Sequence, residues 1–253
     1  MFEVATDLAL LLILAGFLAG LVDAIAGGGG LITVPALLLA GASPVEALAT
    51  NKLQGTFGAA TATLSYARAG QVNLRQQAGM AVISGLAGGL GAIFAHLIPA
   101  EALRLIMPVI LVAVALFFAL KPGLSDQDRV QRLRPAIFSL TAVPLIAAYD
   151  GFFGPGTGSF FMLGFVMLAG YGVLKATAHT KLLNFASNLG ALGVFASAGG
   201  IWWAMGGAMA LAQIAGAHLG ARLAMRIGAR LIKPLLVVTS SAMAARLLWQ
   251  VWG

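Results

Sequence analysis

Long apolar segments separated by short polar loops make up almost all of this 253-residue chain. Hydrophobic residues account for 60% of the sequence and charged residues for only 9%. Soluble domains carry about 25% charged residues. So few charges cannot cover the apolar surface of a soluble fold of this size. The composition therefore excludes a soluble enzyme, a nucleic-acid-binding protein and a disordered chain, and it predicts a protein of the lipid bilayer.

The apolar segments predict where helices cross the membrane. They cover residues 7–26, 30–41, 46–67, 76–98, 102–120, 135–150, 156–170, 173–197, 201–221 and 231–251. A crossing helix needs roughly 20 apolar residues, so the short segments beside glycine clusters are typical of broken or re-entrant helices. We expect an all-α, polytopic membrane protein with about eight main helices, whose first segment is retained as a span rather than cleaved as a signal peptide.

The two halves of the sequence resemble each other. The segment LVDAIAGGGG at 21–30 is similar to AYDGFFGPGT at 148–157. The segment ALATNKLQG at 47–55 is similar to ATAHTKLLN at 176–184. Further matches in the same order align Arg104 and Pro108 with Arg230 and Pro234. Internal repeats are typical of transporter folds.

This similarity predicts two transmembrane repeats, 1–120 and 135–253, joined by a polar cytoplasmic linker at 121–134. Basic residues cluster in the loop at 68–75, in the linker and at 222–233, and basic loops of membrane proteins face the cytoplasm. Each repeat then contains a re-entrant hairpin and three crossings. An odd number of crossings inverts the second repeat and places the N-terminus outside. A single crossing at 135–170 would instead place the third basic loop outside.

Four ionisable residues remain inside the apolar segments. They form one Asp and one Lys per repeat at equivalent positions: Asp23, Lys52, Asp150 and Lys181. A charge at the bilayer centre costs roughly 2.5–3.5 kcal/mol, so such residues usually serve a function. Structural ion pairs between Asp and Lys are the alternative. We expect the two carboxylates to support the hairpins or to carry a coupling proton, because a carboxylate repels a bound anion.

Glycine clusters interrupt the apolar segments after both aspartates. They comprise Gly27, Gly28, Gly29, Gly30, Gly154, Gly156, Thr157 and Gly158, with Pro155 inside the second cluster. Glycine and proline disfavour a regular helix, and unwound backbone at membrane depth must line a cavity or be surrounded by protein. The N–H groups of the helix that follows each break favour an anion. Close helix packing through small residues is the alternative explanation.

Polar side chains recur at helical spacing around both lysines. We predict that they form a midplane anion site between the repeats, which comprises Asn51, Lys52, Gln54, Thr180, Lys181, Asn184 and Asn188. Ammonium and amide donors can replace the hydration shell of an oxyanion. Polar residues in a bundle can also simply hold helices together. The chain has no cysteine and no His, Asp or Glu cluster at metal-ligand spacing, so we expect no metal and no cofactor.

The pattern VDAIAGGGGLITVPALLLAG followed by ATNKLQGTFGAATATLSYARAGQV resembles the TauE/SafE family of sulfite and organosulfonate transporters. The resemblance is densest at 20–75 and returns in weaker form at 148–200, where His179-Thr180-Lys181 stands in place of the triplet Thr50-Asn51-Lys52. It implies a secondary carrier of the inner membrane that moves a small sulfur-containing or organic anion. An anion channel is the alternative function, because paired broken helices also suit a pore. The expected partners are a small anion and lipid, without nucleic acid, and the apolar outer faces also suit a homodimer.

Overall fold

The computed structural model of the chain describes residues 6–99, 101–103, 105–106, 109–110, 113, 127–128 and 130–228. Regular structure within these residues is entirely α-helical, which confirms the expected all-α fold. The helices are α1 (Thr6–Ala26), α2 (Gly30–Leu39), α3 (Pro44–Arg68), α4 (Leu74–Leu97), α6 (Pro135–Leu140), α7 (Ala142–Phe152), α8 (Thr157–Met167), α9 (Val173–Ala198) and α10 (Trp203–Ile227).

Most helix bounds fall within a few residues of the predicted segments, although α10 continues past the expected end at residue 221. The predicted segments at 102–120 and 231–251 lie mostly outside the described residues, as does much of the linker. The aligned pairs Arg104–Arg230 and Pro108–Pro234 also lie outside them.

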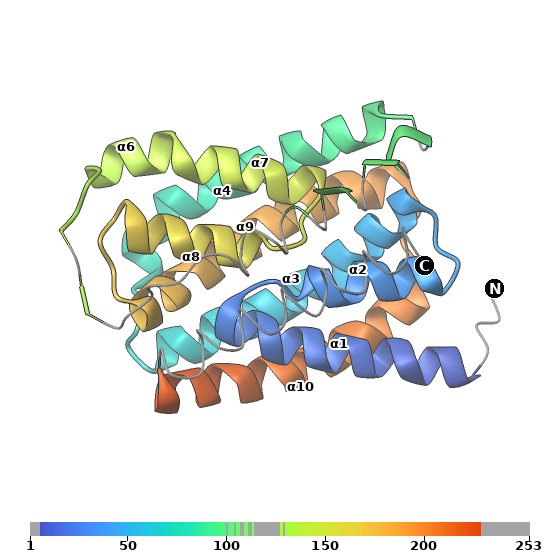
Figure 1. Cartoon of the computed structure of the whole chain (residues 1–253), viewed down its shortest axis with the longest axis horizontal. Coiled ribbons are helices and arrows are strands. Elements are labelled where there is room, and N and C mark those ends of the chain that lie inside the picture. Colours follow the sequence, from blue (N-terminus) through green and yellow to red (C-terminus); the bar gives the residue numbers. More distant parts are fainter. Residues whose placement is uncertain are drawn as a thin grey trace.

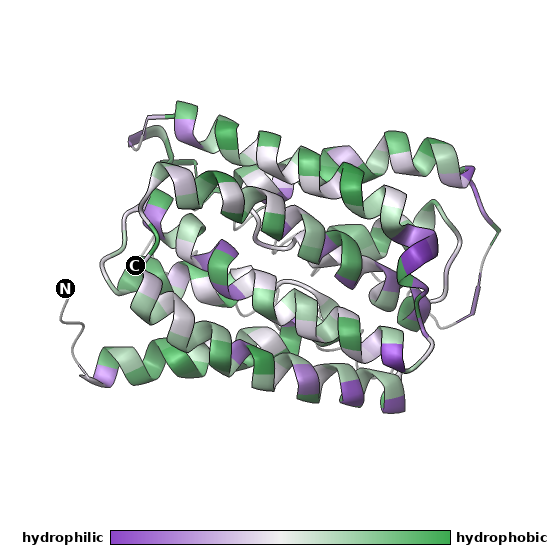
Figure 2. Cartoon of the chain, turned by 180° about the vertical axis from the view of Figure 1, so that it is seen from behind, coloured by the Kyte–Doolittle hydropathy of each residue, from purple (hydrophilic) through white to green (hydrophobic). Residues whose placement is uncertain are grey.

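Several described helices are suited to a bilayer. Thr6–Ala26, Leu74–Leu97 and the stretch Pro135–Phe152 are long and apolar enough to cross a membrane. Large apolar side chains such as Leu86 and Leu90 are mostly exposed on α4, where lipid rather than water would cover them. Figure 2 shows apolar colour along the flanks of the bundle, whereas strongly hydrophilic residues gather toward its ends. The helices α2 and α8 are apolar but only about half as long as a span.

Local capping signals begin the longer helices of the first half. Ser43 accepts a hydrogen bond from the backbone N–H of Glu46, and the Glu46 carboxylate accepts one from the backbone N–H of Ser43 at 2.7 Å. This capping box, together with Pro44 at the first helical position, begins α3. Asn73 caps α4 by accepting hydrogen bonds from the N–H groups of Arg75 and Gln76.

Two helix pairs each combine one helix from the first half with one helix from the second half. The helix α1 packs along α10, and α7 packs along α4, while α3 and α9 contact each other between these pairs. Glycines permit this close approach: a Cβ at Gly216 or Gly220 would collide with the backbone of α1. A Cβ at Gly91 or Gly151 would collide in the same way at the α4–α7 contact. Small residues thus let the helix backbones pack closely.

Most described charges near the two ends of the bundle are separated by sign, with Asp128 at the basic end as the exception. The loop before α10 lies beside the start of α3, where the backbone N–H of Trp202 donates to Thr50 Oγ1 at 3.0 Å. The ends of α3 and α10 therefore lie at the opposite end, which also holds residues 130–134 (left in Figure 1). Basic residues gather at that end: Arg68, Arg75, Arg132, Arg134, Lys175, Arg222 and Arg226. Asp7, Glu46 and Glu101 lie at the other end.

The described part of the linker, residues 127–128 and 130–134, contacts the loop between α8 and α9. The Asp128 carboxylate accepts a hydrogen bond from the backbone N–H of Gly172 at 2.7 Å and pairs with Lys175 at 3.1 Å. These two contacts hold the pKa of Asp128 below its usual value. The backbone N–H groups of Arg132 and Leu133 both donate to the carbonyl of Leu168. The linker is thereby attached to the second hairpin at the basic end of the bundle.

Candidate functional site

Glycines with positive φ break the chain between the helices of each hairpin. After α1, Gly27 and Gly28 have φ values of 82° and 94°. After α7, Gly154 and Gly156 have φ values of 95° and 86°. Side chains larger than hydrogen rarely adopt this left-handed conformation, which explains the glycine clusters at these positions. The predicted breaks in both hairpins are confirmed, and each is followed by a short helix, α2 or α8.

The two breaks touch each other through their backbones. A Cβ at Gly158 would lie 2.9 Å from the Cα of Gly27, which no ordinary packing permits. The side chain of Ser159 crosses the same contact and donates a hydrogen bond to the carbonyl of Ala26 at 2.9 Å. Gly30 lies beside Pro155, where a Cβ would approach the proline Cα to 3.2 Å. The first turns of α2 and α8 are therefore neighbours.

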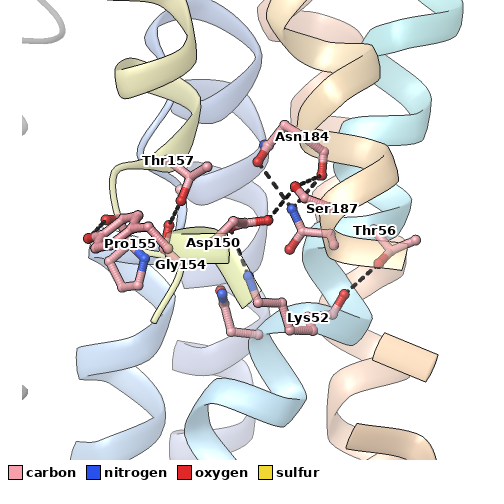
Figure 3. Close-up of polar contacts among 12 residues, drawn as sticks. Lys52, Thr56, Asp150, Gly154, Pro155, Thr157, Asn184 and Ser187 are labelled. Carbon is pink, nitrogen blue, oxygen red and sulfur yellow. Dashed lines mark hydrogen bonds and ion pairs between the residues drawn. The ribbon is translucent and has the colours of Figure 1, made fainter. Parts of the chain in front are cut away.

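A buried ion pair connects the first half to the second. Lys52 Nζ donates to Asp150 Oδ1 at 2.8 Å, and neither side chain is more than 2% exposed. The second carboxylate oxygen of Asp150 accepts a hydrogen bond from Ser187 Oγ at 2.5 Å. Figure 3 shows the Asp150 carboxylate between Lys52 on one side and Ser187 on the other. Both oxygens of Asp150 are thus occupied by partners.

The equivalent residues form a second ion pair, in which the lysine comes from the second half and the aspartate from the first. Lys181 Nζ lies 3.4 Å from Asp23 Oδ2 and also donates to the backbone carbonyl of Asp23. The other carboxylate oxygen accepts a hydrogen bond from the backbone N–H of Gly29 at 3.3 Å. This pair is longer than the first, and the Asp23 side chain is 12% exposed. Asp23 accepts a hydrogen bond from Gly29 of its own hairpin, whereas the partners of Asp150 lie on α3 and α9. Support of the hairpins by the two carboxylates and proton coupling both stay predictions.

A cavity lies where the two breaks meet. Its lining residues come from both halves and are Asp23, Gly28, Gly29, Gly30, Asn51, Gly55, Asp150, Gly154, Gly156, Thr157, Gly158, Asn184, Asn188 and Gln213. Backbone at the N-terminal ends of α2 and α8 therefore forms a large part of its wall. Helix N-termini carry a partial positive charge, which favours an anionic ligand. Several N–H groups of these first turns, among them those of Gly29 and Thr157, already donate within the chain.

Three of the predicted substrate-binding residues line this cavity: Asn51, Asn184 and Asn188. Asn51 is held in place because its Oδ1 accepts a hydrogen bond from Thr33 at 2.6 Å. Asn188 Nδ2 donates to the backbone carbonyl of Asn184 at 2.7 Å. The two asparagines of α9 are thereby held on the same helix face.

The other four predicted residues lie outside the lining. Lys52, Gln54, Thr180 and Lys181 are all fully buried. The two ammonium groups nevertheless lie directly behind lining glycines. A Cβ at Gly154 would be 2.7 Å from Lys52 Nζ, and a Cβ at Gly158 would be 3.6 Å from Lys181 Nζ. A single lining glycine therefore separates each ammonium group from the cavity, and each ammonium group is already paired with an aspartate.

Sequence reasoning missed two residues of the cavity lining, Gln213 and Gly55. Gln213 is the more telling omission, because it is a single amide in the apolar segment MALAQIAGA of α10. A polar side chain amid small apolar residues in a membrane helix was the available signal. Ser187 is a neighbour of Asn188 on α9, but its bond to Asp150 depends on tertiary packing.

His179 does not join this site. Its ring packs against Phe165 and Tyr171 at centroid distances of 5.6 and 4.9 Å. Its backbone carbonyl accepts a hydrogen bond from Gln77. Among the described residues, no group of three His, Asp or Glu side chains could hold a metal ion.

Comparison with known proteins agrees with the resemblance found in the sequence. The chain is 56% identical to a "Probable membrane transporter protein ORF9" of Sinorhizobium sp, over 97% of this chain and 94% of that protein. It is 42% identical to the "Probable membrane transporter protein YfcA" of Escherichia coli K12, over the whole chain and 94% of that protein. A "Probable membrane transporter protein" of Haemophilus influenzae is also 42% identical, over 98% of this chain and 97% of its own length.

No solved structure gives a significant match to the chain. The family model "Sulfite exporter TauE/SafE" matches residues 12–247, which is nearly the full length. Together with the apolar helices, these similarities show a membrane transporter rather than an enzyme. The chain belongs to the TauE/SafE sulfite exporter family.

Proposed function

We propose that this transporter exports a small sulfur-containing or organic anion, such as sulfite, sulfoacetate or another sulfonate, across the inner membrane. The anion would bind in the cavity between the crossed hairpins. The observation that carries this proposal is the convergence of the N-terminal ends of α2 and α8 on a cavity whose side walls carry amide groups. Backbone N–H groups and amide donors together suit an oxyanion of tetrahedral or carboxylate shape.

The two carboxylates in the lining do not exclude an anion from this site. Asp23 and Asp150 are each paired with a lysine, so the four charges sum to zero around the cavity. The partial positive charge of two helix N-termini then remains uncompensated. Both lysines supply additional positive potential from behind Gly154 and Gly158. Lys52 and Lys181 would therefore attract the anion through their positive potential without touching it. Direct contact would require an aspartate to release its lysine when the anion binds.

We propose alternating access between two inverted repeats as the transport mechanism. The exchange of partners between α1–α10 and α7–α4 supports this symmetry. So does the opposite direction of the equivalent helices, because α1 starts at the end of the bundle opposite to α6 in Figure 1. Transporters built this way bind substrate at the repeat interface near the bilayer midplane and open to either side by rocking one repeat against the other.

An anion channel is the second candidate function. Facing N-termini of broken helices can also stabilise an ion inside a pore. The tight backbone contact between Gly27 and Gly158 argues against an open pore along this line, because it leaves no passage between the two breaks. A carrier is therefore the better-supported proposal.

Flux from proteoliposomes tests the proposed function. The purified protein would be reconstituted and loaded in turn with sulfite, sulfoacetate, taurine and acetate. The proposal expects saturable efflux of at least one of the sulfur oxyanions, and weaker or no efflux of acetate. Efflux of none of the four above protein-free vesicles would refute the proposed substrate class. High conductance without saturation would favour the channel.

A further inference from the structure

The inference that follows rests on the proposed function and deepens it, because it names what the bound anion must carry besides its negative charge. Gln213 of α10 lines the cavity, although it belongs to neither hairpin nor to the polar stripes of α3 and α9. Its side chain is 96% buried, at 4% exposure. Its Oε1 atom accepts no hydrogen bond from any residue that the structure describes. A buried amide oxygen without a partner is costly and calls for a ligand or water.

Two glycines make room for this side chain. A Cβ at Gly58 of α3 would lie 2.6 Å from Gln213 Nε2 and 2.7 Å from its Cγ. A Cβ at Gly20 of α1 would lie 2.8 Å from the same Cγ. Gln213 therefore reaches the cavity through a gap that any larger residue at position 20 or 58 would close. Gly20 lies one helical turn before Asp23, so Gln213 packs against the same helix that carries Asp23.

At the positions equivalent to Gly58 and Gln213, the other repeat carries two serines. Ser187 lies 129 positions after Gly58, as Lys181 lies after Lys52, and its hydroxyl donates to Asp150. Ser84 lies 129 positions before Gln213 and donates to the backbone carbonyl of Leu183 at 2.8 Å. On this side the polar groups satisfy one another, and Asp150 is enclosed.

The site is consequently asymmetric. Asp150 is fully partnered, whereas the side with Asp23 has the longer ion pair and the free amide oxygen of Gln213. That side presents hydrogen-bond acceptors, and the N-terminal ends of α2 and α8 present donors. A ligand that satisfies both sides needs oxyanion oxygens at one end and a hydrogen-bond donor at the other.

We propose that Gln213 is a substrate-contacting residue that selects small oxyanions carrying a hydrogen-bond donor, such as a hydroxyl or ammonium group, over those without one. The amide oxygen accepts the hydrogen bond from that donor. A site with a buried polar group discriminates strongly against an analogue that cannot pair with it. Gly20 and Gly58 are positioning residues, because they admit the amide to the cavity.

Matched probes test this selection. The purified protein would be titrated calorimetrically with 2-hydroxyethanesulfonate and with ethanesulfonate, which differ by one hydroxyl group. We expect at least tenfold tighter binding of the hydroxylated probe. Gln213→Met should remove this preference by weakening the hydroxylated probe. Gln77→Met is the control, because Gln77 is equally buried and has an unpartnered Oε1, yet lies outside the cavity. It should keep the preference.

Other outcomes have distinct meanings. Equal binding of both probes by the unmodified protein, or a preference that survives in Gln213→Met, would overturn the role of Gln213 and leave the proposed function intact. Binding of neither sulfonate would overturn this inference, whereas the proposed function would still be decided by the flux assay with sulfite and the other anions. Should Gln213→Met fail to fold, Gly58→Ala provides the same test, because its Cβ displaces the amide. Retention of the preference in that variant would also count against the proposal.

Discussion

Lys52 and Asp150 lie 2.8 Å apart in a buried ion pair that joins the two halves of the transporter, and Lys181 and Asp23 repeat this contact in the opposite sense at 3.4 Å. Each lysine therefore neutralises the aspartate of the other half. The alternative of structural ion pairs, raised by the sequence, is compatible with this geometry. A role in binding is also compatible, because both pairs border the cavity. The predictions below separate these roles.

The two aspartates should differ in their contribution to stability. Asp150→Asn leaves the Lys52 ammonium buried without a counter-charge, and breaking a buried pair in this way costs roughly 3–5 kcal/mol. Asp23→Asn should cost less, because its pair is longer and Lys181 keeps the backbone carbonyl of Asp23 as an acceptor. Thermal unfolding in detergent measures both variants. Equal or reversed losses would contradict this ranking.

The same substitutions test the predicted roles of the carboxylates in transport. Asp23→Asn should lower flux, or alter its dependence on pH, more than it lowers equilibrium binding, because the carboxylate supports the hairpin or carries a proton. Flux at several pH values, compared with a binding titration of the same preparation, provides the measurement. An unchanged transport rate and pH profile in both Asp23→Asn and Asp150→Asn would rule out both roles.

The lysines should contribute to anion binding even though they lie behind the cavity wall. Lys52→Met and Lys181→Met keep the aliphatic stem and remove the charge. We expect each to weaken sulfite or sulfonate binding at least tenfold, about 1.4 kcal/mol. Lys175→Met is a suitable control, because Lys175 is exposed in the linker contact. Native affinity in the folded Lys52→Met and Lys181→Met proteins would assign the lysines a purely structural role.

The backbone contact between the two breaks should tolerate no additional atom. Gly158→Ala places a Cβ against Gly27 Cα and should destabilise the protein by about 1–3 kcal/mol, as overpacking does. Gly193→Ala provides the matched control, since nothing lies within 4 Å of its Cβ and alanine favours a helix. Unfolding temperatures and flux of both variants test this. A Gly158→Ala protein as stable and active as Gly193→Ala would refute the close crossing.

The membrane orientation has its own test. Single cysteines at Asn73, Ser125 and Gly228 should react only from the cytoplasm, because basic loops remain there. Ser125 lies outside the described residues, whereas Asn73 and Gly228 lie at the basic end of the bundle. A cysteine at Ser197, near the opposite end, should react only from outside. Labelling of Asn73 and Gly228 from different sides would contradict the inverted topology.

Much of the fold was predictable from local signals. Hydrophobic segment length located the helices, and the glycine clusters located both breaks, because these features depend on neighbouring residues alone. Asp23, Lys52, Asp150 and Lys181 stood out because charge is costly in a bilayer. Their pairing across the halves could not be chosen in advance, because it depends on how α3 and α9 pack.

The composition of the cavity wall was harder to predict. Helical spacing grouped Asn51, Asn184 and Asn188, and all three line the same cavity because they lie on two helices that contact each other. The same spacing grouped Lys52 and Lys181 with them, although glycines separate both ammonium groups from the cavity. Gln213 could not be assigned to the cavity from the sequence, because its side chain reaches the cavity only past glycines in two other helices. No local pattern in α10 indicates those glycines.

Counterflow tests the proposed alternating-access transport of a small sulfur oxyanion most directly. Proteoliposomes would be loaded with excess unlabelled sulfite or sulfoacetate, and the same labelled anion would be added outside at low concentration. A carrier that exposes one site alternately to each side should accumulate the label transiently above its external concentration, and the excess should disappear when no internal anion is present. Equilibration of the label without any overshoot, together with a flux that does not saturate, would contradict alternating access.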